Sequence, residues 1–282
     1  MSAVDPEVVE TLDALVAEIR REVNFPRLLR RPAPVSYGLL GAVVLLHLAV
    51  FLFAQLVGDR LPSSAPAFDL ALMHGAKINA LVLGGQWWRL SSAMFLHGGF
   101  IHLVFNGYAI FLLGPLLERI YGSRRFLFIY MASGLASELA SVLFTEGPSV
   151  GASGALFGLL GALLVFGVKA RHTVPVRVAR AFSVRLLPWV VVNLAIGFIP
   201  GLPFDNAAHI GGLVTGAVLA VGLGSTLAGE VRGVRAVALE AAFLASCLAA
   251  AWGLVFMARQ VALCSTSAAD FLQCHPASLI GL

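Results

Sequence analysis

Seven apolar segments, each close to the length that crosses a lipid bilayer, divide most of this chain. A spanning helix needs about 20 mainly apolar residues. The segments that meet or approach this length are 37–57, 100–120, 125–144, 152–169, 186–201, 207–227 and 236–258. The fifth is short and ends at Pro200, so it is the least secure span. The sequence therefore predicts an all-α, polytopic membrane helix bundle.

Composition agrees with a membrane protein and excludes several soluble classes. Hydrophobic residues make up 59% of the 282 residues and charged residues 12%, whereas soluble domains carry about 25% charged residues. The net charge of +4 is better explained by loop arginines that set topology than by nucleic-acid binding. The histidines lack acidic or cysteine co-ligands at usable spacing, so neither a metal nor another cofactor is expected.

The distribution of Lys and Arg orients the predicted spans. With seven spans, fifteen of the 19 basic residues fall on the side of the amino terminus and four on the opposite side. Basic residues are enriched in cytoplasmic loops. The amino terminus is therefore predicted to be cytoplasmic and the carboxyl terminus outside. Residues 1–35 form a polar arm with one amphipathic helix, which could lie on the membrane surface or dock on the protein.

A candidate nucleophile, Ser153, opens the fourth apolar segment between Gly151 and Gly154. Flanking glycines let backbone and substrate approach a serine hydroxyl closely. His209 opens the sixth segment, which runs in the same direction, so both residues lie near the outer end. A serine needs a base to take its proton, and His209 is the best candidate.

The two helices carrying these residues have the sequence features needed to approach closely. Small residues recur every four positions on both: Gly154, Gly158 and Ala162 on one, and Ala208, Gly212 and Gly216 on the other. No acid is well placed to complete a triad; Asp205 is interpreted as a loop or cap residue. Phe157 could stack on the His209 ring or be ordinary core.

Two further polar residues share the predicted depth of Ser153. His102 and Asn106 are four residues apart near the outer end of the second segment, so they share one helix face. They could donate to the oxyanion that forms during attack on a carbonyl. His97 is expected at the loop–helix junction, in a supporting role at best.

Together these residues resemble the rhomboid family of intramembrane serine proteases, from about Gln86 to Ala220. The resemblance rests on five motifs in the family's order: Trp88-Arg89, His102-Leu-Val-Phe-Asn106, Glu118 with Gly122, Gly151-Ala-Ser153-Gly154, and Ala208-His209-Ile-Gly-Gly212. It implies a Ser153–His209 dyad, oxyanion donors at His102 and Asn106, and Phe157 beneath His209. It also implies a structural role for Trp88 and Arg89 and cleavage of transmembrane substrates near the outer face.

The resemblance also organises the rest of the chain. A cytoplasmic arm (1–35) precedes a six-helix catalytic core (36–228) with an outer membrane-dipping loop (58–99), in which Trp87 and Trp88 are expected as interfacial anchors. A seventh helix (229–258) and an outer tail (259–282) follow, and Cys264 and Cys274 could pair there. The predicted partners are transmembrane substrates and lipids, in a bacterial cytoplasmic membrane. A catalytically silent membrane-protein binder and a small-solute transporter are the alternatives.

Overall fold

The computed structural model describes residues 6–57, 72–199, 204–226 and 234–264, together with residues 66, 69, 202, 267, 273 and 274. Within these residues the regular elements are helices, and β-pairing is limited to a single bridge between Lys77 and Ser149. The prediction of an all-α bundle is confirmed. The longer helices are α1 (Pro6–Leu29), α2 (Pro34–Val57), α6 (Phe100–Tyr121), α7 (Ser123–Phe144), α8 (Ser153–Lys169), α11 (Asn206–Gly222) and α12 (Val234–Cys264).

Helices coincide with all seven predicted apolar segments. Five segments of the described chain are long and apolar enough to cross a membrane, while α8 and α11 are shorter apolar helices of 17 residues each. Parts of the predicted outer loop, residues 58–65, 67–68 and 70–71, lie outside the described residues, as does the stretch 227–233. The number of spans therefore stays a prediction, although each predicted segment contains a helix.

The fifth segment differs from its predicted bounds. The apolar stretch begins at Val176 and is divided into α9 (Val176–Phe182) and α10 (Leu187–Ile196) by a turn. With ten residues, α10 is about 15 Å long and cannot cross a bilayer by itself. The Phe182 ring of α9 packs beside the ring of Phe166 at the inner end of α8. The predicted span 186–201 thus missed the helix that precedes it.

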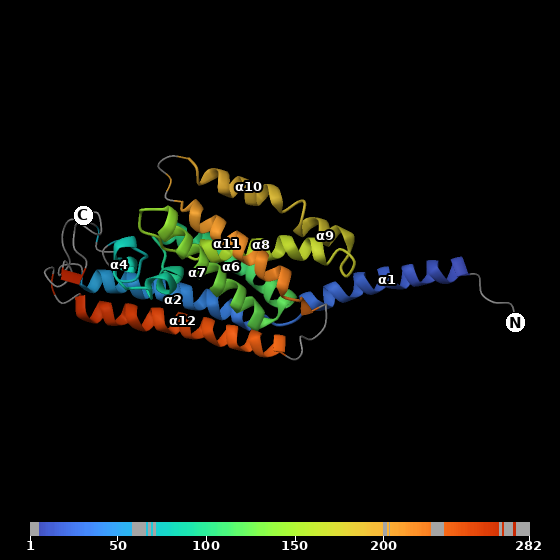
Figure 1. Ribbon diagram of the computed structural model, residues 1–282, viewed down its shortest axis with the longest axis horizontal. Helices are drawn as coiled ribbons and strands as arrows, with labels where there is room; N and C mark the ends of the chain where they lie inside the picture. Colours follow the sequence, from blue (N-terminus) through green and yellow to red (C-terminus); the bar gives the residue numbers. More distant parts are fainter. Residues whose placement is uncertain are drawn as a thin grey trace.

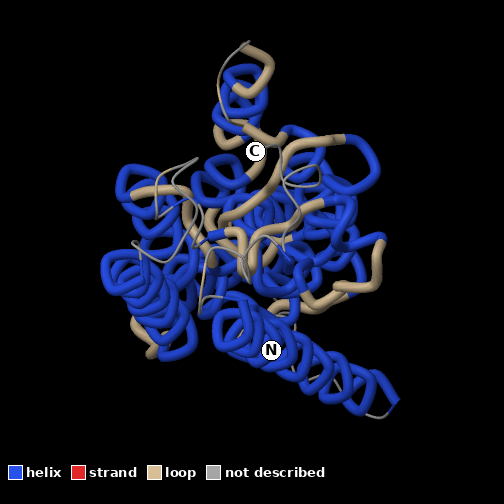
Figure 2. The backbone as a smooth tube through the Cα atoms, turned by 90° about the vertical axis from the view of Figure 1, so that its left-hand side faces the viewer, coloured by secondary structure: helices blue, strands red, loops and turns tan. Residues whose placement is uncertain are grey.

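The central layer of the bundle is formed by α7, α8 and α11, which pack against one another. Figure 1 shows α6 and α2 beside this layer, α12 along one edge and α10 along another, and α1 continuing beyond one end. The end-on view in Figure 2 shows the same helices gathered into one bundle. Since α8 and α11 both begin at the end opposite α1, their first residues share one end of the bundle.

Glu118, near the inner end of α6, ties three helices together. Its carboxylate accepts hydrogen bonds from the Val35 and Ser36 backbone nitrogens, at 3.1 and 2.7 Å, at the start of α2. It also accepts 2.6 Å hydrogen bonds from the hydroxyls of Ser36 and Ser123, the latter being the first residue of α7. Gly122, with φ of +83°, makes the sharp turn between α6 and α7 that brings Ser123 within reach.

The outer loop is packed against the bundle. It contains α4 (Asn79–Leu83), α5 (Arg89–Ser92) and a short 3₁₀ turn, Ala93–Phe95. The buried Arg89 guanidinium donates to the carbonyl oxygens of Met73 and Ala76, at 2.7 and 2.8 Å, and so holds the loop closed. Trp88 is buried against Phe256 of α12, so the prediction of an interfacial anchor is wrong for Trp88. Its ring instead belongs to a buried apolar cluster that joins the loop to Ala54 of α2 and Met257 of α12.

The seventh helix, α12, braces this loop and ends in a disulfide. The hydroxyl of Ser91 donates a 2.7 Å hydrogen bond to the Ala249 carbonyl of α12. A Cβ atom added to Gly253 would lie 2.8 Å from the Ser91 Cβ, so helix and loop are in close contact. Cys264, the last residue of α12, forms a disulfide with Cys274. Most of the predicted tail 259–282 after Cys264 lies outside the described residues.

Candidate active site

Ser153 is the first residue of α8, and the turn before it requires a glycine. Gly151 has φ of +122°, a conformation that residues with a Cβ atom rarely adopt. Its backbone nitrogen donates a 2.9 Å hydrogen bond to the Ala93 carbonyl oxygen, which ties this turn to the outer loop. The start of α8, and with it Ser153, is thus held against this loop at the end of the bundle opposite α1.

His209 lies in the first turn of α11 and reaches Ser153. Its Nε2 atom lies 2.9 Å from the Ser153 Oγ atom, a hydrogen-bonding distance. The imidazole is buried, with 4% of the residue exposed. A histidine nitrogen at this distance can accept the hydroxyl proton when the oxygen attacks an electrophile.

Glycines let the two helices meet at backbone level. A Cβ atom added to Gly212 would overlap the carbonyl oxygen of Gly154, and one added to Gly216 would overlap that of Gly158. The predicted close approach through small residues is confirmed at these four positions. The distance between Ser153 and His209 therefore depends on the packing of α8 against α11.

Phe157 orients the imidazole from below. Its ring stacks on the His209 ring with centroids 4.3 Å apart and an interplanar angle of 14°. The other ring nitrogen of His209, Nδ1, is buried with no hydrogen-bond partner among the residues that the structure describes. Ring stacking therefore holds the imidazole where a triad would use a carboxylate.

Asp205 is an N-cap residue, in agreement with its interpretation as loop or cap. Its carboxylate accepts from the Ala208 backbone nitrogen at 3.0 Å, which caps α11. The same carboxylate also accepts from the hydroxyls of Ser141 and Thr145 at the end of α7. These bonds fix the entry of α11, and with it the backbone that carries His209.

His102 and Asn106 converge on the turn before Ser153. A Cβ atom added to Gly151 would lie 2.8 Å from His102 Nε2 and 3.5 Å from Asn106 Nδ2. The His102 Nδ1 atom accepts a 3.3 Å hydrogen bond from the Gly98 backbone nitrogen, which assigns the ring proton to Nε2. The Asn106 amide nitrogen is buried without a hydrogen-bond partner in the described chain. Two donor nitrogens thus lie beside Gly151, in the turn that precedes Ser153.

Comparison of the sequence with known proteins identifies the family to which the chain belongs. Residues 84–226, just over half of the chain, match the model of the Rhomboid domain. The chain belongs to the rhomboid family. It is 42% identical to Rhomboid protease GluP from Bacillus subtilis (strain 168) over 161 residues, which cover 57% of this chain and 31% of GluP.

Two other relatives cover different shares of their own length. Rhomboid protease AarA from Providencia stuartii is 32% identical over 201 residues, covering 64% of this chain and 70% of AarA. RHOMBOID-like protein 6, mitochondrial, from Arabidopsis thaliana is 40% identical over 159 residues, covering 56% of this chain and 50% of that protein. The matched regions thus cover from 31% to 70% of the length of these three relatives.

The matched rhomboid domain contains every residue predicted for the site. It begins after α4 and ends just after α11, so α1, α2 and α12 lie outside it. The structure brings Ser153, His209, Phe157, His102 and Asn106 together at one end of this domain. Trp88 and Arg89 lie in the outer loop, and the loop contacts the site through the Gly151–Ala93 hydrogen bond.

His97 lies beside the site as a buried ring. Its ring packs edge-on against His102, with centroids 5.2 Å apart, and His47 of α2 lies on its other side at 6.4 Å. Burial, with smaller effects from His102 and His47, lowers the pKa of His97 to about 3, so the ring is uncharged at neutral pH. His47 was not anticipated, since a lone histidine in an apolar segment has no distinguishing spacing.

A buried lysine of the outer loop was also missed by sequence reasoning. The Lys77 ammonium donates to Asn79 Oδ1 at 3.0 Å and to the Gly147 carbonyl at 2.8 Å. Burial lowers the pKa of Lys77, and the nearby carboxyl groups of Asp205 and Glu138 oppose that shift. Through these hydrogen bonds Lys77 joins the loop to the segment after α7, near the Asp205 cap of α11. Its members come from distant segments, so no local motif reveals it.

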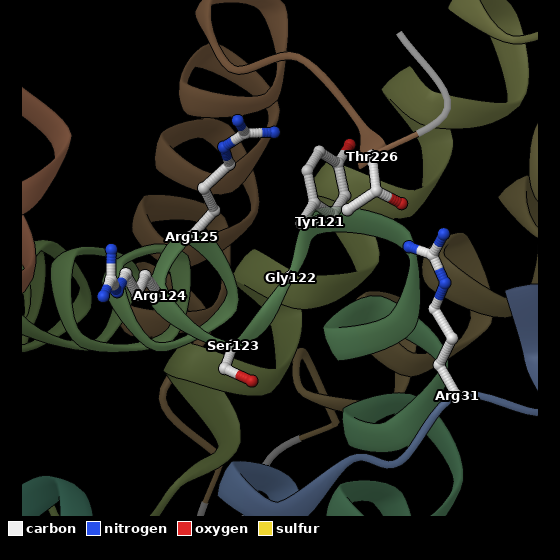
Figure 3. Close-up of a pocket in the computed structure, with 7 residues that line it drawn as sticks. All are labelled: Arg31, Tyr121, Gly122, Ser123, Arg124, Arg125 and Thr226. Carbon is white, nitrogen blue, oxygen red and sulfur yellow. The ribbon is translucent and has the colours of Figure 1, made fainter. Parts of the chain in front are cut away.

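A cavity of about 550 Å³ lies at the opposite end of the rhomboid domain from Ser153. It is lined by Arg31, Tyr121, Gly122, Ser123, Arg124, Arg125 and Thr226 (Figure 3). Arg124 pairs with Glu240, and Arg125 donates to the Gly224 carbonyl, so two of the three arginines already have partners. The cavity lies beside the turn between α6 and α7, and its lining includes none of the residues of the candidate active site.

Proposed function

We propose that this protein is an intramembrane serine endopeptidase that cleaves transmembrane proteins near the outer face of the membrane. The observation that carries the proposal is the 2.9 Å approach of Ser153 Oγ and His209 Nε2 at one end of an apolar helix bundle. The names of GluP and AarA as rhomboid proteases support it. The surrounding donors and the stacked Phe157 match the needs of acyl transfer.

The reaction follows from the positions of these atoms. Ser153 Oγ attacks the scissile carbonyl carbon while its proton moves to His209 Nε2. The carbonyl oxygen becomes an oxyanion, which accepts hydrogen bonds from Asn106 Nδ2 and His102 Nε2. Collapse of the tetrahedral intermediate breaks the C–N bond, and the leaving amine takes the proton from His209. Water then attacks the acyl-enzyme while His209 takes its proton, and His209 returns this proton to Ser153 Oγ as the carboxylic acid product leaves.

The proposed organisation follows the predicted domains. Residues 1–35 form a cytoplasmic arm, 36–228 a six-helix catalytic core with the outer loop 58–99, 229–258 a seventh spanning helix and 259–282 an outer tail. Basic residues on the side of the amino terminus support this orientation. A bacterial cytoplasmic membrane is the proposed location, with single-spanning substrates and surrounding lipids as partners.

Cleavage by the purified protein in liposomes tests the proposal. The wild type should cleave a single-spanning model substrate and should react with a fluorophosphonate at Ser153, whereas Ser153→Ala and His209→Ala should do neither. Ser246→Ala is the matched control, because this hydroxyl donates to the Ala242 carbonyl of its own helix, α12. Absence of both cleavage and labelling in the wild type would favour the silent binder. Solute uptake that survives Ser153→Ala would favour the transporter.

A further inference from the structure

The first helix carries an apolar face that the rest of the chain leaves exposed. Five residues make up this face, each between 40% and 54% exposed: Val9, Leu12, Val16, Ile19 and Val23. We call them the seam. Their spacing alternates between three and four residues, which is the a/d spacing of a coiled coil. Valine occupies each a position, and leucine and isoleucine occupy the d positions.

The seam lies opposite the face by which α1 docks on its own bundle. Phe25 and Leu28 near the carboxyl end of α1 are buried, with Phe25 packed against Phe182 of α9. At 100° per residue, these two positions and the half-buried Ala17 and Arg21 lie on the side of α1 away from the seam. Docking of α1 therefore leaves the seam exposed, although Val16 also lines a cavity beside His172 and Thr173 of its own chain.

We infer that the seam of α1 pairs with the seam of a second copy of this chain, as a short parallel coiled coil at the inner face of the membrane. Two copies inserted in one membrane share one orientation, so their α1 helices leave the bundle in the same direction and can only pair in parallel. β-Branched a positions with leucine at d favour two strands in parallel coiled coils, and the three valines and Leu12 follow this rule, whereas Ile19 at the second d position departs from it.

The charges that flank the seam fit this pairing. Across a parallel seam, position g of one helix faces position e of the following heptad on the other helix. This places Glu22 opposite the partner's Arg27 and Leu15 opposite the aliphatic stem of the partner's Arg20, so these facing positions carry no like charges. Glu22 also accepts a 2.7 Å hydrogen bond from Arg177 of its own chain. A carboxylate has two oxygens and can accept from both arginines.

The direction of α1 argues for a second copy rather than for lipid. Figure 1 shows α1 continuing past the end of the bundle opposite Ser153, along the long axis of the molecule and clear of the other helices. A helix that leaves the membrane in this way cannot lay its seam on the bilayer surface. A seam of little more than two heptads is too short to pair stably in free solution. Confinement of two chains to one bilayer raises their effective concentration and offsets this.

Site-specific disulfide crosslinking of the full chain in liposomes tests the pairing. The background is Cys247→Ala, because the chain has three cysteines and the other two form the Cys264–Cys274 disulfide. Leu12→Cys places a thiol at a d position, and Ala14→Cys places one on the exposed opposite side of the same helix. Mild oxidation should give a covalent dimer with Leu12→Cys and not with Ala14→Cys. Adding Ile19→Asp to Leu12→Cys should abolish the dimer.

Three results would overturn the inference. The first is equal crosslinking at both positions, which would show random collision. The second is a Leu12→Cys thiol that a soluble maleimide labels fully and that oxidation still does not crosslink. The third is quenching of a fluorophore at position 12 by a quencher in the lipid chains, which would place the seam on the bilayer. The readout does not use proteolysis, so failure here is distinguishable from absence of protease activity.

Discussion

The Nε2 atom of His209 lies 2.9 Å from the Ser153 hydroxyl, while its Nδ1 atom is buried and has no hydrogen-bond partner in the part of the chain that the structure describes. In a serine–histidine–aspartate triad a carboxylate bonded to Nδ1 would hold the ring. Here the ring is positioned by the Phe157 face below it and by the capped helix that carries it. Each of these two supports can be removed separately by substitution, of Phe157 for the stacked ring and of Asp205 for the cap.

Replacing Phe157 with alanine should slow cleavage. A stacked aromatic pair is worth about 0.5–1.5 kcal/mol beyond its buried area, so loss of the ring should reduce kcat by roughly two- to tenfold. Phe157→Tyr keeps an aromatic face and should retain most of the activity. Rates of single-turnover cleavage in liposomes would measure both variants. A Phe157→Ala enzyme as fast as the wild type would show that stacking does not position His209.

Substitution of Asp205 separates a capping role from a triad role. Asp205→Asn keeps an N-cap acceptor and should change kcat little, whereas Asp205→Ala should destabilise the protein by about 0.5–2 kcal/mol through loss of the cap. If Asp205 were a triad member, asparagine would reduce kcat by about 10⁴. Cleavage rates and thermal unfolding of both variants decide between these outcomes.

Removal of an oxyanion donor should have a larger effect. Asn106→Ala is expected to reduce kcat by roughly 10²–10³, as at other oxyanion holes, without changing the melting temperature greatly. Phe105→Ala is the matched control, because the neighbouring Phe105 is 70% exposed on the outside of the bundle. Full activity of Asn106→Ala would contradict the assignment of Asn106 as a donor.

The contact between α8 and α11 should tolerate no added side chain. Gly212→Ala would place a methyl group against the Gly154 carbonyl, and overpacking of this kind costs about 1–3 kcal/mol. Gly38→Ala in α2 is the control, because an added Cβ atom there would meet nothing within 4 Å. Thermal unfolding and cleavage should both decline for Gly212→Ala alone. Parallel loss in both variants would indicate that any added methyl group disturbs the bundle.

Features with a local signature could be predicted from the sequence. Apolar length placed the helices, the recurring glycines and alanines anticipated the backbone contact between α8 and α11, and the position of Asp205 before α11 indicated a cap. The pair His102 and Asn106 was recognisable because residues four apart share a helix face. Each of these predictions depends only on residues that lie close together in the sequence.

Features that depend on distant segments could not be predicted in the same way. The burial of Trp88 requires Phe256 of α12, and the site of Lys77 requires the carbonyl of Gly147 at the end of α7. The turn that separates α9 from α10 carries no strong breaker, since Pro188 falls inside the first turn of α10, where proline is tolerated. Tertiary contacts decided all three.

The shortness of α8 has a consequence for the bilayer itself. A helix of 17 residues is about 25 Å long, whereas the hydrocarbon core is about 30 Å thick. Its partner α11 has the same length, so the centre of the bundle has a hydrophobic mismatch that the longer α6, α7 and α12 around it do not share. Since α8 is largely buried among its neighbours, lipid meets this mismatch through the surrounding helices, at the end of the bundle where Ser153 begins α8. The rate of cleavage should therefore depend on membrane thickness and differ between thin and thick bilayers.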